Sequence, residues 1–115
     1  NLNNCEVKNI GTSAKAYFLD GRLILMREHP ENSSETGENS LGGFNQDWYY
    51  DNGDVYFIFM TEANTDKEYR LYYNNGKLIR WIDSDGKVYN SVYRWDEMQA
   101  FYDYAKAQCD SASSN

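Results

Sequence analysis

Basic residues, histidine, proline and cysteine are all scarce in this 115-residue sequence. Eleven Lys and Arg stand against 18 Asp and Glu, which gives a formal net charge of −7 at pH 7. No cationic excess is present to displace counterions from nucleic acid or to attract an anionic lipid surface, so we expect neither partner. No apolar run approaches the roughly 20 residues that span a bilayer, and we therefore expect no membrane insertion by this segment.

The single histidine limits the chemistry that the sequence offers. His29 stands beside Pro30 without a Cys or His neighbour, which is typical of a solvated loop residue rather than a metal ligand. Residues 83–86, Asp-Ser-Asp-Gly, begin like a calcium loop, but Val92 stands where an EF-hand has its bidentate acid. Without a nucleophile–histidine set, we expect no catalytic residue, no metal site, no cofactor and no enzymatic activity.

The two cysteines, Cys5 and Cys109, lie near opposite ends of the chain. They allow two interpretations, which are two independent thiols or one disulfide that joins the termini. The Tyr- and Asn-rich, Lys-poor composition suits an oxidising compartment and favours the disulfide. Such a bridge would stabilise the fold by about 4–5 kcal/mol in the entropic description, because it closes nearly the whole chain.

Four dipeptides between apolar runs predict chain reversals: Asp20-Gly21, Asn52-Gly53, Asn75-Gly76 and Asp85-Gly86. Both central residues of a type I′ turn need φ > 0, which Gly adopts freely and Asn or Asp tolerates. Three of the dipeptides lie in near-copies of one unit, at residues 17–23, 49–55 and 72–78. The sequence therefore predicts hairpins at residues 14–28, about 47–61 and about 67–83.

The C-terminal part of the sequence changes its period. Residues 83–86 predict a turn into a further strand, Lys87 to Val92. From Trp95 to Cys109 the apolar residues recur at helical spacing, and Asp96 and Glu97 complement the dipole of the predicted helix. Strands followed by one helix predict an α+β fold, a mainly antiparallel meander sheet of six to seven strands with the C-terminal helix packed on one face.

By its length the chain is expected to form one domain over residues 1–115. We expect an ordered core at about 12–109 and a mobile loop at about 29–45, where the sequence is polar, acidic and Gly-rich.

A two-residue turn fixes the register of its hairpin, so cross-strand partners can be predicted. The predicted pairs next to the turns include Tyr17–Ile24, Tyr49–Tyr56 and Tyr72–Ile79, with Arg70 opposite Trp81. Side chains alternate between two faces of a strand. One face is apolar and is expected beneath the helix: Phe18, Leu23, Leu25, Trp48, Tyr50, Val55, Phe57, Phe59, Leu71, Tyr73, Leu78 and Ile82. The other is an aromatic stripe edged with charge: Tyr17, Ile24, Tyr49, Tyr56, Tyr72, Ile79 and Trp81, among Lys15, Arg22, Asp47, Asp51, Asp54, Arg70 and Lys77.

This second face is the candidate binding surface. Flat rings on a rigid sheet can stack on sugar rings or grip a peptide, while flanking charges supply hydrogen bonds. The predicted ligand-binding residues are Tyr17, Tyr49, Tyr56, Arg70, Tyr72 and Trp81, with Arg70 stacked on Trp81 as a cation–π pair. The partner is an unidentified carbohydrate or protein.

Three other interpretations stay open. Tyrosine is a good strand former, so the stripe could serve only to stabilise the sheet. The same face could be the subunit interface of a homodimer, in which case the chain is a structural or oligomerising domain. In the third interpretation, the loop at 29–45 is the lid of a hydrolase or an inhibitor.

The units Trp48-Tyr-Tyr-Asp-Asn-Gly53 and Tyr72-Tyr-Asn-Asn-Gly-Lys-Leu78 resemble the aromatic-turn-glycine units of Gram-positive surface proteins, such as choline- or glucan-binding wall repeats. The turn glycines at 21, 53, 76 and 86 are unevenly spaced, unlike those repeats, so choline binding is not carried over. Residues 14–108 are similar more broadly to secreted or lipoprotein-anchored hairpin domains of gut Gram-positive bacteria. The resemblance implies a non-catalytic, extracellular binding module anchored at a bacterial cell surface.

Overall fold

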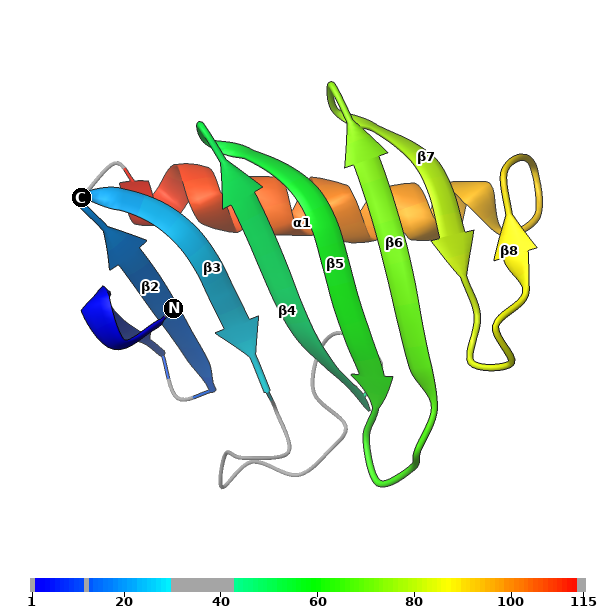
Figure 1. Ribbon diagram of the computed structural model, residues 1–115, viewed down its shortest axis with the longest axis horizontal. Coiled ribbons are helices and arrows are strands. Elements are labelled where there is room, and N and C mark those ends of the chain that lie inside the picture. Colours follow the sequence, from blue (N-terminus) through cyan, green and yellow to red (C-terminus); the bar gives the residue numbers. More distant parts are fainter. Residues whose placement is uncertain (1, 12, 30–42, 114–115) are drawn as a thin grey trace.

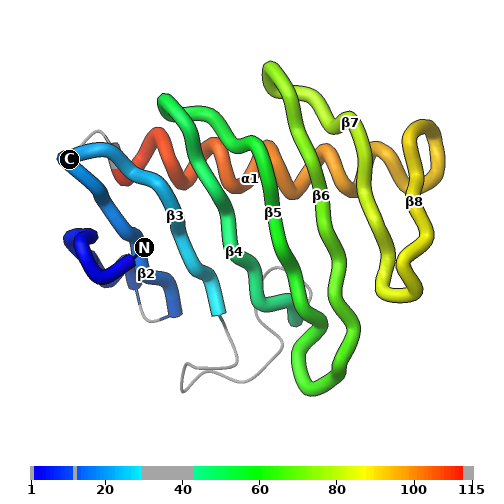
Figure 2. The backbone as a smooth tube through the Cα atoms, in the orientation of Figure 1, coloured from blue at the N-terminus to red at the C-terminus, as the bar shows by residue number. Residues whose placement is uncertain are grey.

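The computed structural model describes residues 2–11, 13–29 and 43–113, which form a two-layer α+β structure (Figure 1). Within these residues, one antiparallel sheet has eight strands in the order of the sequence, from β1 to β8. The elements are η1 (Leu2–Asn4), β1 (Glu6–Ile10), β2 (Ala14–Leu19), β3 (Arg22–Glu28), β4 (Phe44–Asp51), β5 (Asp54–Glu62), β6 (Glu68–Asn74), β7 (Lys77–Ile82), β8 (Val88–Tyr89) and α1 (Trp95–Ser113). Figure 2 shows that the chain crosses the sheet strand by strand and that α1 then returns behind it from the β8 side toward β2.

The predicted antiparallel meander with a C-terminal helix is confirmed, but the number of strands is wrong by at least one. The missed strand is β1, which lies at the sheet edge and before the predicted core. Four of its five residues are exposed, so it lacks the apolar alternation that would predict a half-buried strand. The strand predicted from Lys87 to Val92 is shorter, at Val88–Tyr89, and the helix runs four residues beyond Cys109.

The predicted type I′ turns are confirmed. Asp20, Asn52 and Asn75 each have φ of 52°, and the glycine after each has φ of 81–83°. The turn before β8 is different, because Gly86 N–H donates to the carbonyl oxygen of Asp83 at 3.0 Å and makes Ser84 and Asp85 the central residues. Neither of these has a positive φ, whereas Gly86 after them does. There the carboxylate of Asp83 accepts hydrogen bonds from the amides of Asp85 and Lys87, each at 2.9 Å.

Each of the three hairpins contains a β-bulge directly after the second residue pair from its turn. The pairs Phe18–Leu23, Tyr50–Val55 and Tyr73–Leu78 agree with the predicted register. One extra residue then follows in the second strand of each hairpin, at Ile24, Tyr56 and Ile79. The next pairs are therefore Tyr17–Leu25, Tyr49–Phe57 and Tyr72–Arg80, and the predicted register is wrong from this point onward.

The bulges exchange the faces of the residues that follow them, because side chains alternate along a strand. Leu25, Phe57, Phe59 and Ile82, expected beneath the helix, pair instead in the rows on the opposite face. The core beneath α1 receives Met26, Ile58, Met60 and Trp81 in their place.

Two buried tyrosines fix α1 on the sheet. Tyr50 donates a hydrogen bond to the carbonyl oxygen of Ala105 at 2.9 Å. Tyr73 donates in the same way to the carbonyl oxygen of Met98 at 2.7 Å. Gln99 adds a third link, since its side-chain amide bonds the backbone of the β6–β7 turn in both directions. The helix therefore covers one face of the sheet, and no other α-helix of the described residues lies over the opposite face (Figure 1).

Candidate functional site

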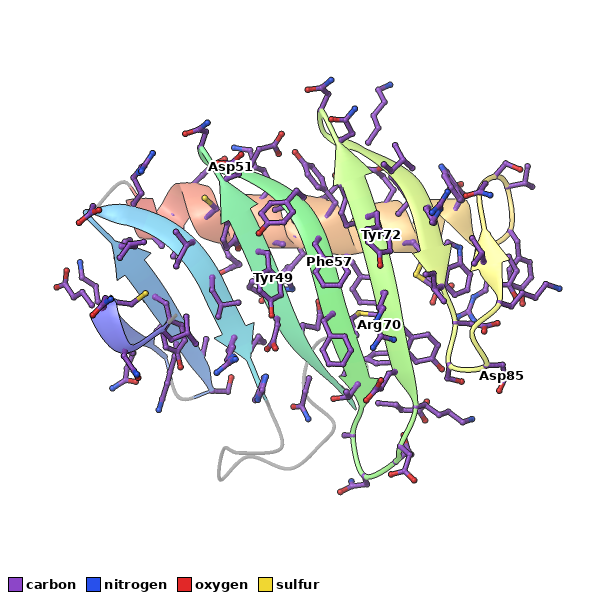
Figure 3. All side chains as sticks on the ribbon, viewed as in Figure 1. Tyr49, Asp51, Phe57, Arg70, Tyr72 and Asp85 are labelled. Atoms are coloured by element: carbon purple, nitrogen blue, oxygen red, sulfur yellow. The ribbon has the colours of Figure 1, made fainter. Side chains whose placement is uncertain are left out.

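The sheet face turned away from α1, here called the open face, carries two rows of side chains that run across the strands. The cross-strand pairs define the first row as Val7, Tyr17, Leu25, Tyr49, Phe57, Tyr72 and Arg80. They define the second row as Asn9, Lys15, Arg27, Asp47, Phe59, Arg70, Ile82 and Val88. Figure 3 shows Tyr49, Phe57, Tyr72 and Arg70 in front of the sheet, on the side opposite the helix.

Three neighbouring rings form the centre of the first row, and we call Tyr49, Phe57 and Tyr72 the aromatic row. The ring centroids of Tyr49 and Phe57 are 5.5 Å apart, and those of Phe57 and Tyr72 are 5.0 Å apart. Each ring is half-buried, so each keeps a surface that a ligand can reach. Burial and then the nearby Asp47 carboxylate raise the pKa of Tyr49 above its usual value, which keeps the hydroxyl protonated at neutral pH.

The second row places charged side chains along one side of these rings. The guanidinium of Arg70 lies 5.1 Å from the ring centroid of Phe59 and contacts the carboxylate of Glu68 at 3.4 Å. At the other end of the row, the guanidinium of Arg27 lies 5.5 Å from the ring centroid of Tyr17. Cations held over aromatic faces keep a defined position and still present N–H groups to a ligand.

Two open cavities lie beside the first row among the described residues, and the smaller one includes Tyr49 of the aromatic row in its lining. The larger, of about 630 Å³, lies on strands β1 to β3 and includes Lys15, Tyr17, Arg27 and His29 in its lining. The smaller, of about 430 Å³, is lined by Leu2, Ile24, Leu25, Tyr49, Tyr50, Asp51 and Tyr56. Leu2 of η1 thus helps to cover Leu25, which explains how Leu25 is buried on the open face.

The two rows of the open face together carry a net charge opposite in sign to that of the whole chain. Its two rows contain four basic residues, Lys15, Arg27, Arg70 and Arg80, and one acidic residue, Asp47. The sequence has 11 basic and 18 acidic residues, so the acidic excess lies elsewhere. An anionic or strongly polar ligand is favoured on this face over the rest of the described surface.

Five of the six predicted binding residues belong to this region. Tyr17, Tyr49, Tyr72 and Arg70 lie in the two rows. Tyr56 is an exposed bulge residue whose ring centroid is 6.3 Å from that of Tyr49.

The prediction that Trp81 belongs to the binding surface is wrong. It lies beneath α1, is 1% exposed and donates a hydrogen bond to the carbonyl oxygen of Tyr93 at 3.1 Å. The bulge at Ile79 moved it to the core face, so Arg70 pairs with Ile82 and stacks on Phe59 instead.

The sequence analysis missed Phe57, Phe59 and Arg27 as members of the open face. No local signal in the sequence marks the two phenylalanines, because their face depends on the bulge at Tyr56. Arg27 depends in the same way on the bulge at Ile24.

The predicted disulfide is not formed, although both cysteines belong to the described residues. Cys109 is buried on the inner side of α1, where its Sγ contacts the carbonyl oxygen of Gly53 at 3.8 Å. Cys5 lies between η1 and β1 and is half-buried. The Cys109 side chain on α1 thus faces the β4–β5 turn, whereas Cys5 lies next to β1, the edge strand of the sheet.

His29 is not the solvated residue that the sequence suggested, because its Nε2 lies 2.8 Å from Asp47 Oδ1. Of the predicted loop at 29–45, residues 30–42 lie outside the described residues, and β4 already begins at Phe44. Within the described ranges, no group of three or more His, Cys, Asp and Glu residues is placed to hold a metal ion. No helix in this part of the chain has the length and apolar character needed to cross a membrane.

Comparisons of the chain with protein-family models, with curated proteins and with solved structures found no match. The function is therefore inferred from the open face.

Proposed function

We propose that this chain is a non-catalytic binding module that binds a carbohydrate chain along the open face of its sheet. The observation that carries the proposal is the aromatic row, in which three half-exposed rings contact one another and lie beside a row of charged side chains. Its placement at a bacterial cell surface stays a prediction from the resemblance.

The dimensions of the open face suit an extended ligand. Neighbouring strands lie about 4.8 Å apart, so the first row from β2 to β7 is roughly 24 Å long. A sugar ring presents C–H groups to the face of an aromatic ring and hydroxyl groups at its edge. In the second row, Arg70 and Asp47 lie within one residue pair of the aromatic row and can bond those hydroxyls.

A peptide fits this surface less well than a carbohydrate. Bound peptides commonly add a strand to a sheet edge or place a helix in an apolar groove. The aromatic row instead lies on inner strands of the sheet, whose backbone groups are already paired with neighbouring strands. Its cavities also mix charged and aromatic lining, which suits a ligand that is polar along its whole length.

A glycan array followed by titration calorimetry tests the proposal. The test variant is Tyr49→Ala with Tyr72→Ala, and the control is Tyr93→Ala, an exposed tyrosine outside the two rows. We expect the double variant to bind about tenfold more weakly or worse, because each ring contact contributes about 0.5–1.5 kcal/mol. The control should bind like the unmodified chain.

Two results would contradict the proposal. One is a set of arrays on which no glycan binds, and the other is binding that the double variant keeps while its circular dichroism remains native.

Sedimentation velocity tests the alternative that the open face is a subunit interface. A concentration-independent dimer that the double variant abolishes would show that the open face joins two copies of this chain.

A further inference from the structure

We infer that the larger cavity on strands β1 to β3 binds an acidic group of that carbohydrate, a carboxylate or a sulfate attached to a sugar. This inference rests on the proposed function and assigns the ligand class of the same surface. The cavity of about 630 Å³ has Lys15, Tyr17, Arg27 and His29 in its lining. Tyr17 and Tyr49 both belong to the first row, with Leu25 between them, so a chain on the aromatic row can reach the cavity.

Two cations in this cavity face each other without an intervening acid. Lys15 and Arg27 are direct cross-strand partners in β2 and β3. Like charges directly opposite each other destabilise a sheet, so their pairing calls for an anion that is not part of the strand pair. The hydroxyl of Ser13, also in the lining, donates a hydrogen bond of 2.7 Å to the carboxylate of Glu28. That carboxylate is therefore already hydrogen-bonded.

Asp47, the one acid of the two described rows, offsets only part of this positive charge. It lies 2.8 Å from His29 Nε2 and forms an ion pair with Arg27 Nε at 3.6 Å, a distance too long for a hydrogen bond. Lys15 and Arg27 together therefore keep an excess of one positive charge over Asp47. Arg27 Nε is buried and has no hydrogen-bond partner in the structure. A buried N–H without a partner is costly, so Asp47 does not fully satisfy this guanidinium. The side chain of Arg27 is 38% exposed and lines the cavity, where a ligand oxygen can contact it.

Oxyanions on a sugar are the ligands that match this geometry. A guanidinium can donate two parallel hydrogen bonds to a carboxylate or a sulfate, and a lysine ammonium beside it adds a second charge. The ring of Tyr17 holds the guanidinium of Arg27 in place, since the two are stacked at 5.5 Å. The net charge of −7 repels an acidic polymer from the rest of the molecule, so binding is confined to the face where cations prevail.

Calorimetry with matched oligosaccharides tests the inference. The probes are an oligogalacturonate, the same oligomer with its carboxylates methyl-esterified, and a sulfated galactose oligomer. We expect one of the two acidic probes to bind at least tenfold more tightly than the esterified one, and the preference to shrink as salt is raised. The acidic probe that binds identifies the group as carboxylate or sulfate.

Three variants link the preference to the cavity. Lys15→Gln and Arg27→Gln should each reduce the affinity for the acidic probe about tenfold and leave that for the esterified probe unchanged. Lys67→Gln removes the same charge from an exposed residue between β5 and β6 and should change neither affinity. Arg27→Lys keeps the charge and should recover part of the loss.

The outcomes separate this inference from the proposed function. Equal binding of acidic and esterified probes would overturn the inference and keep the carbohydrate module. Loss of acidic preference in Lys67→Gln to the same extent as in Lys15→Gln would also overturn it, because the effect would then come from net charge. Poly-L-glutamate bound as tightly as the oligogalacturonate would overturn the assignment to a sugar. Absence of binding to every probe and every arrayed glycan would overturn both.

Discussion

Lysine substitutions at two adjacent positions of β5 test whether the bulge at Tyr56 decides the composition of the open face. The structure places Ile58 in the core, with 0% exposure, and Phe57 half-exposed on the open face. A regular register after the turn would reverse the two. Ile58→Lys and Phe57→Lys should therefore differ greatly in stability. The less stable variant identifies which of the two residues lies on the core face.

The magnitudes follow from the surroundings of each residue. Ile58→Lys loses about 1.5–3 kcal/mol of apolar burial. It also buries a charge without a partner, which adds several kcal/mol, so the total is comparable to the 5–15 kcal/mol that stabilises a typical domain. Phe57→Lys loses two ring contacts of about 0.5–1.5 kcal/mol each, while the lysine stem still covers the sheet and its ammonium reaches water.

Urea unfolding followed by circular dichroism measures the contrast. Phe57→Lys should unfold cooperatively with a midpoint lowered by roughly 1 M, given a slope of about 1–3 kcal/mol per M. Ile58→Lys should show no cooperative transition. A folded Ile58→Lys beside an unfolded Phe57→Lys would refute the bulged register, and with it the membership of Phe57 in the aromatic row.

Three further predictions concern the turns and the buried tyrosines. Deleting Tyr56 should cost only about 1–2 kcal/mol in urea unfolding, because regular pairing would then keep Phe57 opposite Tyr49; complete unfolding of the deletion variant would contradict the bulge. Gly53→Ala should lose about 1–2 kcal/mol, measured in the same way, since φ is 81° there and no other atom crowds the site. Burial raises the pKa of Tyr50 and of Tyr73 in the folded state above the unfolded value of 10, so the stability from these groups is present below pH 10 and falls by about 1.4 kcal/mol per pH unit for each above it. Other tyrosines with raised pKa values, such as Tyr102, add to the same alkaline slope. Replacing Tyr73 by Phe should therefore reduce the slope by about 1 kcal/mol per pH unit in urea titrations between pH 10 and 11, and an unchanged slope would count against the buried phenol.

The candidate site illustrates how far sequence reasoning reaches. Tyr17, Tyr49 and Tyr72 lie on the face opposite α1, as the sequence predicted, because each precedes its turn in the first strand of a hairpin and its face depends only on the turn. Trp81 was placed wrongly because it follows a bulge. Each extra residue costs little locally and is marked by no residue type, since Ile24, Tyr56 and Ile79 are all ordinary strand formers.

The sequence by itself determined where the chain reverses and which segment is helical. Glycines and their Asn or Asp neighbours carry this information locally, through the backbone angles that they can adopt. Only the tertiary structure decided which face most residues beyond each turn occupy, because the bulges place Ile58 and Trp81 beneath α1, where they pack in the core. The same packing brought Lys15 and Arg27 together, and the face on which a ligand would be bound is therefore a product of the assembled sheet.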